Sequence, residues 1–251
     1  MMEKDCYEKE EAFLLDTAKI EKDTPKRAGA PVPLPEKQPP MGARIFPLPE
    51  VELLGDAEVN FLELVELRAS VREYTEESLS LKELSYLLWC TQGVKMPLPE
   101  GRSLRTVPGA GARHALETYL FVQRVLGLPP GFYRYLAYEH ALLPLWDELP
   151  YEEKAVPFSL AFSSGRTVRA SAVTLVWTAA RERLTYDFGR RGYRYAFLDA
   201  GHACQNLYLA AQTIKLGVCA LGAFDDAALA EVLRLDGEKE FPLYAASVGK
   251  R

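Results

Sequence analysis

The sequence has few cysteines and histidines, and it has no excess of basic residues. Its four cysteines are far apart and none forms a C-x-x-C pair, so we expect reduced thiols without a disulfide framework. The three histidines, His114, His140 and His202, lack the spacing of a zinc motif, and no metal site is predicted. A net charge of −5 gives no basic surface for nucleic acid, so no nucleic-acid partner is expected.

Long hydrophobic runs are also missing. The N-terminus, MMEKDCYEKEEAFLLD, lacks the basic start and the apolar core of a signal peptide. The most apolar window, ASAVTLVWTAA at 170–180, is too short to span a bilayer. We therefore expect a cytoplasmic protein with no membrane segment. Its 251 residues, 48% of them hydrophobic, are enough to bury a real core.

Proline is concentrated at the N-terminal end, where eight of the 17 prolines fall within the first 50 residues. We predict a short charge-rich helix within 1–24, followed by a stretch that can hold neither a helix nor a strand ladder. Residues 1–50 are thus interpreted as a proline-rich leader, extended or partly disordered. Two alternatives remain open, a disordered tail or a strap across a neighbouring subunit. Residues 51–251 are predicted to form one globular domain.

The globular part mixes helices and strands. Apolar spacing predicts a helix at 57–68, and a capping box of Ser80 and Glu83 begins a second helix that ends at Gly93. Further helices are expected up to about residue 216 and at 225–235. Strands are predicted at 116–125, as a pair within 131–146, at 171–180 as a central buried strand, at 217–224 as a strand or loop, and at 242–251. No β-α-β alternation is visible, which favours an α+β fold.

One charged cluster stands out in LRASVRE at 67–73. Arg68, Ser70 and Arg72 offer two guanidinium groups and a hydroxyl, a combination that suits a phosphate. The alternative is a pair of surface arginines that form ion pairs with Glu66 and Glu73, and such pairs are common. On this motif alone the alternative is favoured.

Two glycine-containing segments can approach a ligand closely. RTVPGAGARHALETY at 105–119 carries Pro108, Gly109 and Gly111, which allow a backbone to lie against a flat ring. GVCALGAFDD at 217–226 places Gly217 and Gly222 around a short apolar run, where backbone amides can face a ring or an oxyanion. A flexible surface loop and an ordinary strand–turn–helix connection would look the same.

A polar seam runs along the helix that follows residue 190. Asp199, His202 and Asn206 sit at i, i+3 and i+7 and so share one face of an otherwise apolar segment. Buried polar groups need partners. They either bond one another and the backbone, or line a ligand site or a subunit interface.

Taken in order, four segments carry a family resemblance. They are the Arg-Ser-Arg cluster, RTVPGAGARHALETY, GRRGYRYAFLDAGHACQNLYLAAQTIKLGVCALGAFDD and PLYAASVGKR. Together they resemble the FMN-dependent nitroreductase-like family, and within it the SagB-type dehydrogenase branch, from about residue 53 to 251. The resemblance implies an α+β fold with a mixed central sheet flanked by helices. It also implies an intertwined homodimer with FMN at the interface, along which the helix with the polar seam lies.

The resemblance also implies which residues bind FMN. The phosphate and ribityl chain are expected at Arg68, Ala69, Ser70 and Arg72, and the phosphate also at Lys250 and Arg251. The ring is expected beside Pro108, Gly109, Ala110, Gly111 and Ala112, with its reactive edge at Leu221 and Gly222. The implied activity is hydride transfer through FMN in two half-reactions, with NADH or NADPH as a candidate electron donor. The implied substrate is a small molecule or a peptide heterocycle. The alternative is a non-catalytic binding or scaffold module of a peptide-modifying complex.

Two departures from the family pattern concern the site. Azoline-oxidising members of this branch carry a Lys-Tyr pair where this chain has Asp187 and Phe188, and phenylalanine cannot transfer a proton. Gly109 stands where a serine is commoner. No catalytic side chain is assigned, and Asp187 and His202 are the candidates.

Overall fold

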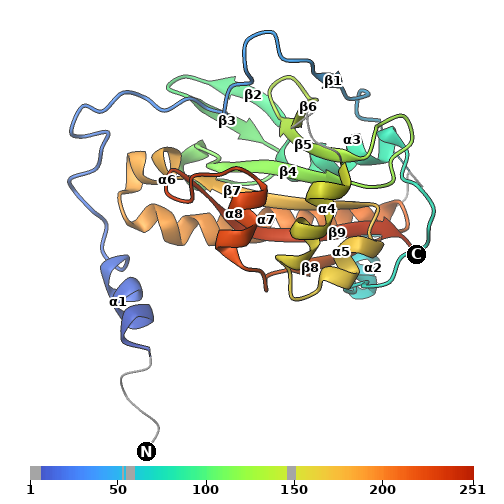
Figure 1. The fold of residues 1–251 in the computed structure, drawn as a ribbon. Coiled ribbons are helices and arrows are strands. Elements are labelled where there is room, and N and C mark those ends of the chain that lie inside the picture. The colour runs from blue at the N-terminus through green and yellow to red at the C-terminus, as the bar shows by residue number, and fades with distance from the viewer. Residues whose placement is uncertain (1–6, 53, 55–59, 146–150) are drawn as a thin grey trace, which may run out of the picture.

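The computed structural model describes residues 7–52, 54, 60–145 and 151–251. It is an α+β structure in which a seven-stranded sheet has helices on both faces (Figure 1). The described helices are α1 (Glu8–Asp16), α2 (Phe61–Leu67), α3 (Leu81–Gln92), the 3₁₀ turn η1 (Ala110–Ala112), α4 (Tyr151–Leu160), α5 (Gly165–Ala170), α6 (Arg181–Phe188), α7 (Arg191–Thr213) and α8 (Asp226–Val232). The described strands are β1 (Phe46–Pro47), β2 (Val94–Leu98), β3 (Arg102–Arg105), β4 (Leu116–Val122), β5 (Gly131–Leu136), β6 (Ala141–Leu145), β7 (Val173–Ala180), β8 (Leu216–Leu221) and β9 (Glu240–Lys250).

The main sheet has the strand order β1-β6-β5-β4-β7-β9-β8, and β2 and β3 form a separate hairpin. Each pairing of neighbouring strands described in the main sheet is antiparallel, so the sheet is antiparallel where a mixed one was expected. Parallel pairing is seen in two isolated bridges, one of which joins Ser70 to Val218. That bridge attaches the segment after α2 to the edge strand β8.

The predicted central strand is confirmed. β7 lies between β4 and β9, and seven of its eight residues are buried. Successive side chains of a strand point to opposite faces, and both faces here are covered. Leu175 and Trp177 pack on one face, and Val176 packs on the other. A continuous apolar run therefore marks this strand in the sequence.

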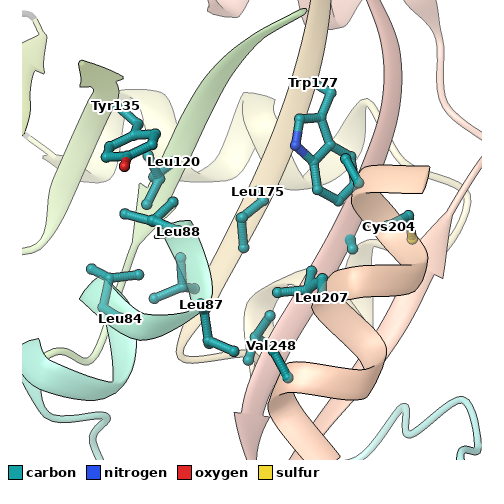
Figure 2. Packing of buried hydrophobic residues seen from close by; sticks show 14 of the residues in the cluster. Leu84, Leu87, Leu88, Leu120, Tyr135, Leu175, Trp177, Cys204, Leu207 and Val248 are labelled. Atoms are coloured by element: carbon teal, nitrogen blue, oxygen red, sulfur yellow. The ribbon is translucent and has the colours of Figure 1, made fainter. Parts of the chain in front are cut away.

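Two cores lie on the two faces of the sheet. The larger one packs α3 and α7 against the sheet, and its close packing includes Leu84 and Leu88 of α3, Trp177 of β7 and Leu207 of α7 (Figure 2). The smaller one lies under α4, α5 and α8 and is rich in phenylalanine, including Phe121 and Phe158. No helix in the described ranges is both long enough and apolar enough to pass through a bilayer.

The helix ends show how local sequence sets local structure. The capping box is confirmed, because Ser80 accepts from the amide of Glu83 and the Glu83 side chain accepts from the amide of Ser80. Asp225 caps α8 in the same way through Ala228. The stretch before α7 differs from the prediction, since α6 is a separate helix. It ends at Gly189, whose φ of 56° turns the chain before α7 begins.

The leader is more ordered than its prolines suggest. The predicted N-terminal helix is present as α1. The expectation that the proline-rich stretch cannot join a ladder is wrong for Phe46 and Pro47, which pair with Leu142 and Ala141 of β6. Proline is tolerated there because β1 is the outermost strand, where one side of the backbone needs no partner. The described leader also contacts the rest of its own chain through several buried side chains.

Candidate functional site

Ser70 is held beside the edge strand β8 by backbone and side-chain contacts. The amide of Val71 donates to the carbonyl of Val218 at 2.8 Å. The Tyr208 hydroxyl of α7 accepts from the Ala220 amide at 2.8 Å and shares a hydrogen bond of 2.9 Å with the Ser70 Oγ. Ser70 is exposed at the end of this chain of hydrogen bonds.

The two arginines of the cluster face the same edge without acidic partners. The Arg68 guanidinium lies 5.4 Å from the ring centre of Tyr208, a cation–π distance, and Arg72 is exposed. In the part of the chain that the structure describes, neither arginine has a carboxylate at ion-pair distance, although Glu66 and Glu73 are close in sequence. The ion-pair alternative is therefore not what the structure shows, and both guanidinium groups are available to an anion.

Ala69 lies beside the same edge, and Lys250 lies on the neighbouring strand β9. Ala69 is exposed between Arg68 and Ser70. Lys250 is opposite Leu216 in the β8–β9 ladder, at the other end of β8 from Leu221. Its Nζ lies 2.5 Å from the Glu83 carboxylate, so this ammonium group already has a partner. Arg251 is exposed.

Gly222 follows the last residue of β8 and leaves open space. Leu221 is buried, whereas Gly222 is exposed. A Cβ added to Gly222 would meet the Tyr244 ring at 3.7 Å, which is ordinary contact. Burial raises the pKa of Tyr244 to about 12, so its hydroxyl keeps its proton at neutral pH. The backbone at this corner is thus accessible to a flat ligand.

The loop of residues 108–112 requires glycine at two positions. A Cβ on Gly109 would lie 2.6 Å from the His114 Nδ1, closer than real Cβ contacts allow. His114 donates from Nε2 to the Ser103 carbonyl at 3.0 Å, and burial lowers its pKa to about 3, which keeps it neutral. Gly111 has a φ of 59°, and a Cβ there would lie 3.0 Å from the Phe188 ring. The glycine at 109 is therefore explained by His114.

The polar seam of α7 holds flanking segments in place. Asp199 accepts from the Ala110 amide at 3.1 Å, and burial raises its pKa. Asn206 donates to the Cys90 carbonyl at 2.9 Å, and His202 is exposed. The three side chains do not bond one another, but Asp199 and Asn206 bond the backbone, so the first alternative is wrong for mutual bonds and confirmed for the backbone bonds of these two residues. Asp199 and Asn206, seven residues apart, lie about 10 Å apart along the helix axis, too far for a mutual hydrogen bond, and each bonds a backbone group outside α7.

Asp187 is fixed in an ion pair. Its Oδ2 accepts from the Arg113 Nε at 2.5 Å, and its Oδ1 lies 3.5 Å from the Lys26 Nζ. Burial raises the pKa of this carboxyl, but the hydrogen bond and charge of Arg113 with the charge of Lys26 outweigh burial and leave it below the usual range. Arg113 is itself buried and lies 4.6 Å from the Tyr186 ring centre. A carboxylate held in this way is a poor proton acceptor near neutral pH.

The two groups of predicted site residues lie on opposite sides of α7. Tyr208, which holds Ser70, comes nine residues after Asp199, which holds Ala110. At about 100° per residue this is two and a half turns, and at 1.5 Å per residue it is roughly 14 Å along the axis. One chain therefore brings Arg68, Ser70 and Gly222 to one edge, but it keeps the 108–112 loop on the other side of the helix.

An exposed strip of α7 separates these two groups. It contains Phe197 and Leu198, each more than half exposed, together with Gly201, His202 and Gln205. The neighbouring helix α2, which packs against α7, adds four more exposed apolar side chains, Phe61, Leu62, Val65 and Leu67. So large an apolar surface is unusual for a face in contact with water.

Three residues of this arrangement were not predicted from the sequence. Tyr208 contacts both Ser70 and Arg68. The His114 ring leaves no space for a Cβ at residue 109. Arg113 forms an ion pair with Asp187. Tyr208 lies within the apolar periodicity of α7, so its pattern indicates only a core residue. Arg113 directly follows the glycine loop, but its partner Asp187 lies 74 residues further along the chain.

Comparisons with known proteins identify the family. The model named "Nitroreductase family" matches residues 65–250. The chain is 35% identical over 202 residues, 80% of this chain and 96% of the relative, to a protein of Methanocaldococcus jannaschii named as a nitroreductase.

Solved structures have the same fold. A protein of Desulfovibrio desulfuricans described as a nitroreductase in complex with FMN has a TM-score of 0.54 at 19% identity, covering 77% of this chain and 87% of that one. The Escherichia coli microcin synthetase McbBCD complex with truncated pro-MccB17 bound has a TM-score of 0.60 at 21% identity, covering 96% and 91%. At these identities the likeness concerns the fold alone. Because the family match spans strands β2 to β9 together with α7, this chain is a member of the nitroreductase family.

Proposed function

We propose that this protein is an FMN-dependent oxidoreductase of the SagB-type branch that passes hydride between two substrates through the flavin in two half-reactions. The observation that carries the proposal is the row of groups along β8. Two arginines that pair with no carboxylate of the described residues lie with the Ser70 hydroxyl at this edge, and the open backbone of Gly222 lies at its end.

The donor set of this row fits FMN. Arg68, Ser70 and Arg72 supply charge-assisted hydrogen bonds of the kind that hold a phosphate. Gly222 leaves room for the flat ring, since nothing but the edge of Tyr244 lies within 4 Å of a Cβ added there. FMN would supply the capacity to accept and donate hydride, and the chain would bind and orient it. Lys250, already paired with Glu83, would add positive charge nearby rather than a free donor.

We further propose a homodimer with FMN at the interface. In one chain the 108–112 loop lies across α7 from Ser70, so this chain cannot bring both groups to one ring. The exposed strip of Phe197 and Leu198 lies between them, next to the apolar residues of α2. A second copy packed on that strip would bring its own loop toward Ser70 of the first. It would also bury the apolar side chains, which favours association at roughly 25 cal/mol per Å².

The nature of the substrate follows from Asp187 and Phe188. Asp187 is held by Arg113 and Lys26, and Phe188 has no proton to transfer. The chain thus lacks the pair that azoline oxidation uses in this branch. We propose instead a small-molecule substrate, such as a nitro or quinone compound, with NADH or NADPH as the electron donor.

The test begins with the absorbance spectrum of the purified protein. We expect a flavin spectrum, or its appearance after addition of FMN, and bleaching on anaerobic mixing with NADH or NADPH. A colourless protein that takes up no FMN contradicts the cofactor. A flavin that neither nicotinamide donor bleaches contradicts the proposed donor and leaves a heterocycle dehydrogenase.

The Arg68→Ala variant tests the site itself. We expect loss of flavin retention, because a guanidinium–phosphate contact is removed. Arg181→Ala, which removes an exposed arginine of α6, is the matched control and is expected to retain flavin as the wild type does. Equal flavin retention in both variants would show that Arg68 does not bind the FMN phosphate.

A scaffold module of a peptide-modifying complex is the second candidate. The fold likeness to the microcin synthetase complex, which extends over 96% of this chain, favours it. It predicts a folded protein that takes up no FMN at millimolar concentration. FMN binding with nicotinamide-driven turnover excludes it.

A further inference from the structure

The described leader is held on its own chain at several places, including Thr17 and Glu21 against the start of α7 and β1 against β6, and two further places bear on the 108–112 loop. It runs from α1 along the body of the molecule and over the β2–β3 hairpin to β1 (Figure 1). The first place is the segment Pro35–Lys37, and the second is Lys26. The family match begins only at residue 65, so this part of the chain lies outside it.

At the first place the leader lies against a cluster of buried ionic side chains, the charged cleft. Glu117 of β4 pairs with Arg183 of α6 at 2.5 Å and with Arg134 of β5 at 3.4 Å, and all three side chains are almost fully buried. Arg183 donates to the Pro35 carbonyl at 2.8 Å. The Lys37 amide donates to Glu117 at 2.7 Å, and Arg134 donates to the Lys37 carbonyl at 2.5 Å. Three buried ionic side chains thus bind the leader backbone.

The side chains of the leader complete this anchor. Glu36 is 3% exposed, and its carboxyl accepts from the Ala137 amide at 2.6 Å. The Lys37 ammonium lies 2.6 Å from Glu240 and 3.0 Å from the Tyr119 hydroxyl. Removal of the segment would leave buried charges with fewer partners, which is costly. The contacts are therefore those of a specific docking site.

At the second place the leader reaches the corner between α6 and α7. The Lys26 amide donates to the Tyr186 carbonyl at 3.1 Å, and its ammonium lies 3.5 Å from Asp187. Asp187 in turn accepts from Arg113, the residue directly after the 108–112 loop. The next residue of the corner, Phe188, lies against Gly111 of that loop. A continuous set of contacts joins the leader to the loop.

We propose that the leader is a regulatory strap, which docks through Pro35–Lys37 in the charged cleft and through Lys26 holds the Asp187–Phe188 corner against the 108–112 loop. When the strap is docked, the loop is fixed in the conformation seen here. When the strap is released, Lys26 leaves Asp187, and the corner and loop gain mobility. The part of this inference that concerns FMN rests on the proposed function, whereas the coupling between leader and loop does not.

Glu36 makes docking sensitive to pH. Burial, followed by the negative charge of Glu117, raises its pKa to about 7. Arg105 and Glu139 also act on it, and Arg134 and Arg183 face the neighbouring leader residues. His114 stays neutral here, because its pKa is about 3.

The direction of the pH effect follows from this raised pKa. In the released leader Glu36 has its ordinary pKa of 4.5, so docking requires a proton between the two values. Docking is strongest below pH 4.5, weakens as the pH rises to about 7, and stays weak above it. A cavity of about 600 Å³ is lined by Glu36, Lys37 and Glu117.

Hydrogen–deuterium exchange of the full-length protein tests the coupling. In Lys26→Ala we expect faster exchange than in the wild type, by about three-fold or more, both in residues 24–38 and in residues 106–113. Lys19→Ala, an exposed lysine of the same leader, is the matched control and is expected to match the wild type. Faster exchange in the leader with unchanged exchange in 106–113 would overturn the proposal. Unchanged exchange in both segments would overturn it too.

The Glu36→Gln variant tests the pH dependence of strap docking, and the test needs neither FMN nor turnover. The amide oxygen can still accept from Ala137 but no longer ionises. After correction for the intrinsic pH dependence of exchange, we expect wild-type leader protection to fall by about ten-fold or more from pH 5 to pH 8. Protection in Glu36→Gln is expected to stay level. If protection falls equally with pH in the wild type and in Glu36→Gln, ionisation of Glu36 does not control docking of the strap.

Flavin binding separates this inference from the proposed function. If the protein binds FMN, Lys26→Ala is expected to weaken binding by about three-fold or more, and an unchanged affinity contradicts the link to the site. If the wild type takes up no FMN, the proposed function fails. The exchange experiments then still decide whether the strap holds the loop.

Discussion

The two halves of the candidate site differ in how they are built. The half along β8 has few contacts: Tyr208 contacts Ser70 and Arg68, one backbone bridge joins Ser70 to β8, and neither arginine has an acidic partner in the described ranges. The 108–112 half is fixed by steric limits at two glycines and by a buried ion pair behind it. Arg68, Arg72 and Ser70 are thus accessible to a charged ligand, whereas the conformation of the 108–112 loop is restricted by contacts with neighbouring side chains. The two halves should therefore respond differently to substitution.

The largest effect on stability is expected from Arg113→Met, which removes the ion pair with Asp187 that supports the 108–112 loop. Arg113 is buried and gives Asp187 its closest cationic partner while also donating to the Glu100 carbonyl, so about 3 kcal/mol of stability should be lost on its removal. For a chain of this size that corresponds to a fall in Tm of roughly 6–12 °C. Differential scanning calorimetry of the flavin-free protein measures it.

Lys82→Met is the control for this prediction. Lys82 pairs with Glu52, and both side chains are more than half exposed. Such pairs contribute about 0–1 kcal/mol, so Tm should stay within about 3 °C of the wild type. Equal losses in the two variants would show that Arg113 does not hold the loop half.

Gly109→Ala and Gly222→Ala compare the halves with the same added methyl group. The Cβ at 109 meets the His114 ring at 2.6 Å, so strain of about 1–3 kcal/mol is expected. The Cβ at 222 makes ordinary contact, so the flavin-free protein should lose at most about 0.5 kcal/mol. The free energy of unfolding in urea provides the comparison. If the order is reversed, the loop half is not the more constrained one.

Tyr208→Phe addresses the half along β8. The hydroxyl that joins the Ala220 amide to Ser70 is lost, which should weaken FMN binding by about 0.5–1.5 kcal/mol, or roughly two- to ten-fold. Quenching of FMN fluorescence measures the affinity. Tyr86→Phe, which removes a hydroxyl bonded to Thr213 near the end of α7, should leave the affinity unchanged. An equal loss in both variants would assign the effect to α7 as a whole.

The smallest effect is expected from Asp199→Asn. Burial raises the pKa of Asp199 above the ordinary 3.8, so its ionisation costs stability. That cost grows as the pH rises from 3.8 through the raised pKa. The amide can still accept from Ala110, so stability at pH 7 should change by less than about 1 kcal/mol. Unfolding measured across pH 4–8 should show a flatter profile than the wild type, and an identical profile would rule out this role of Asp199.

Local sequence predicted much of the fold because the relevant signals act over a few residues. The Ser80–Glu83 capping box, the Asp225 cap and the apolar run of β7 were all confirmed. The separate helix α6 was not predicted, since its polar composition shows no clear apolar period. The antiparallel sheet was not predicted either, because pairing depends on contacts between distant segments.

For the site, the sequence identified residue types but not their neighbours. It predicted that Arg68, Ser70 and Arg72 suit a phosphate, and it left ion pairing as the favoured alternative. Among the described residues neither arginine has an acidic partner, while Asp187 and Lys250 have fixed ones. Ion pairs form between residues that are 74 and 167 positions apart, such as Arg113–Asp187 and Glu83–Lys250. No spacing rule within one segment reports such partners.

The sequence by itself determined the elements, the buried central strand and the resemblance to one family, because turn chemistry, helix caps and apolar periodicity are local properties. Only the tertiary structure decided which charged groups are paired and which side of α7 each half of the site occupies. It also placed the leader against buried ions and against the corner that supports the loop. The physical reason is that electrostatic pairing and steric fit depend on distances through space, which the folded chain alone sets.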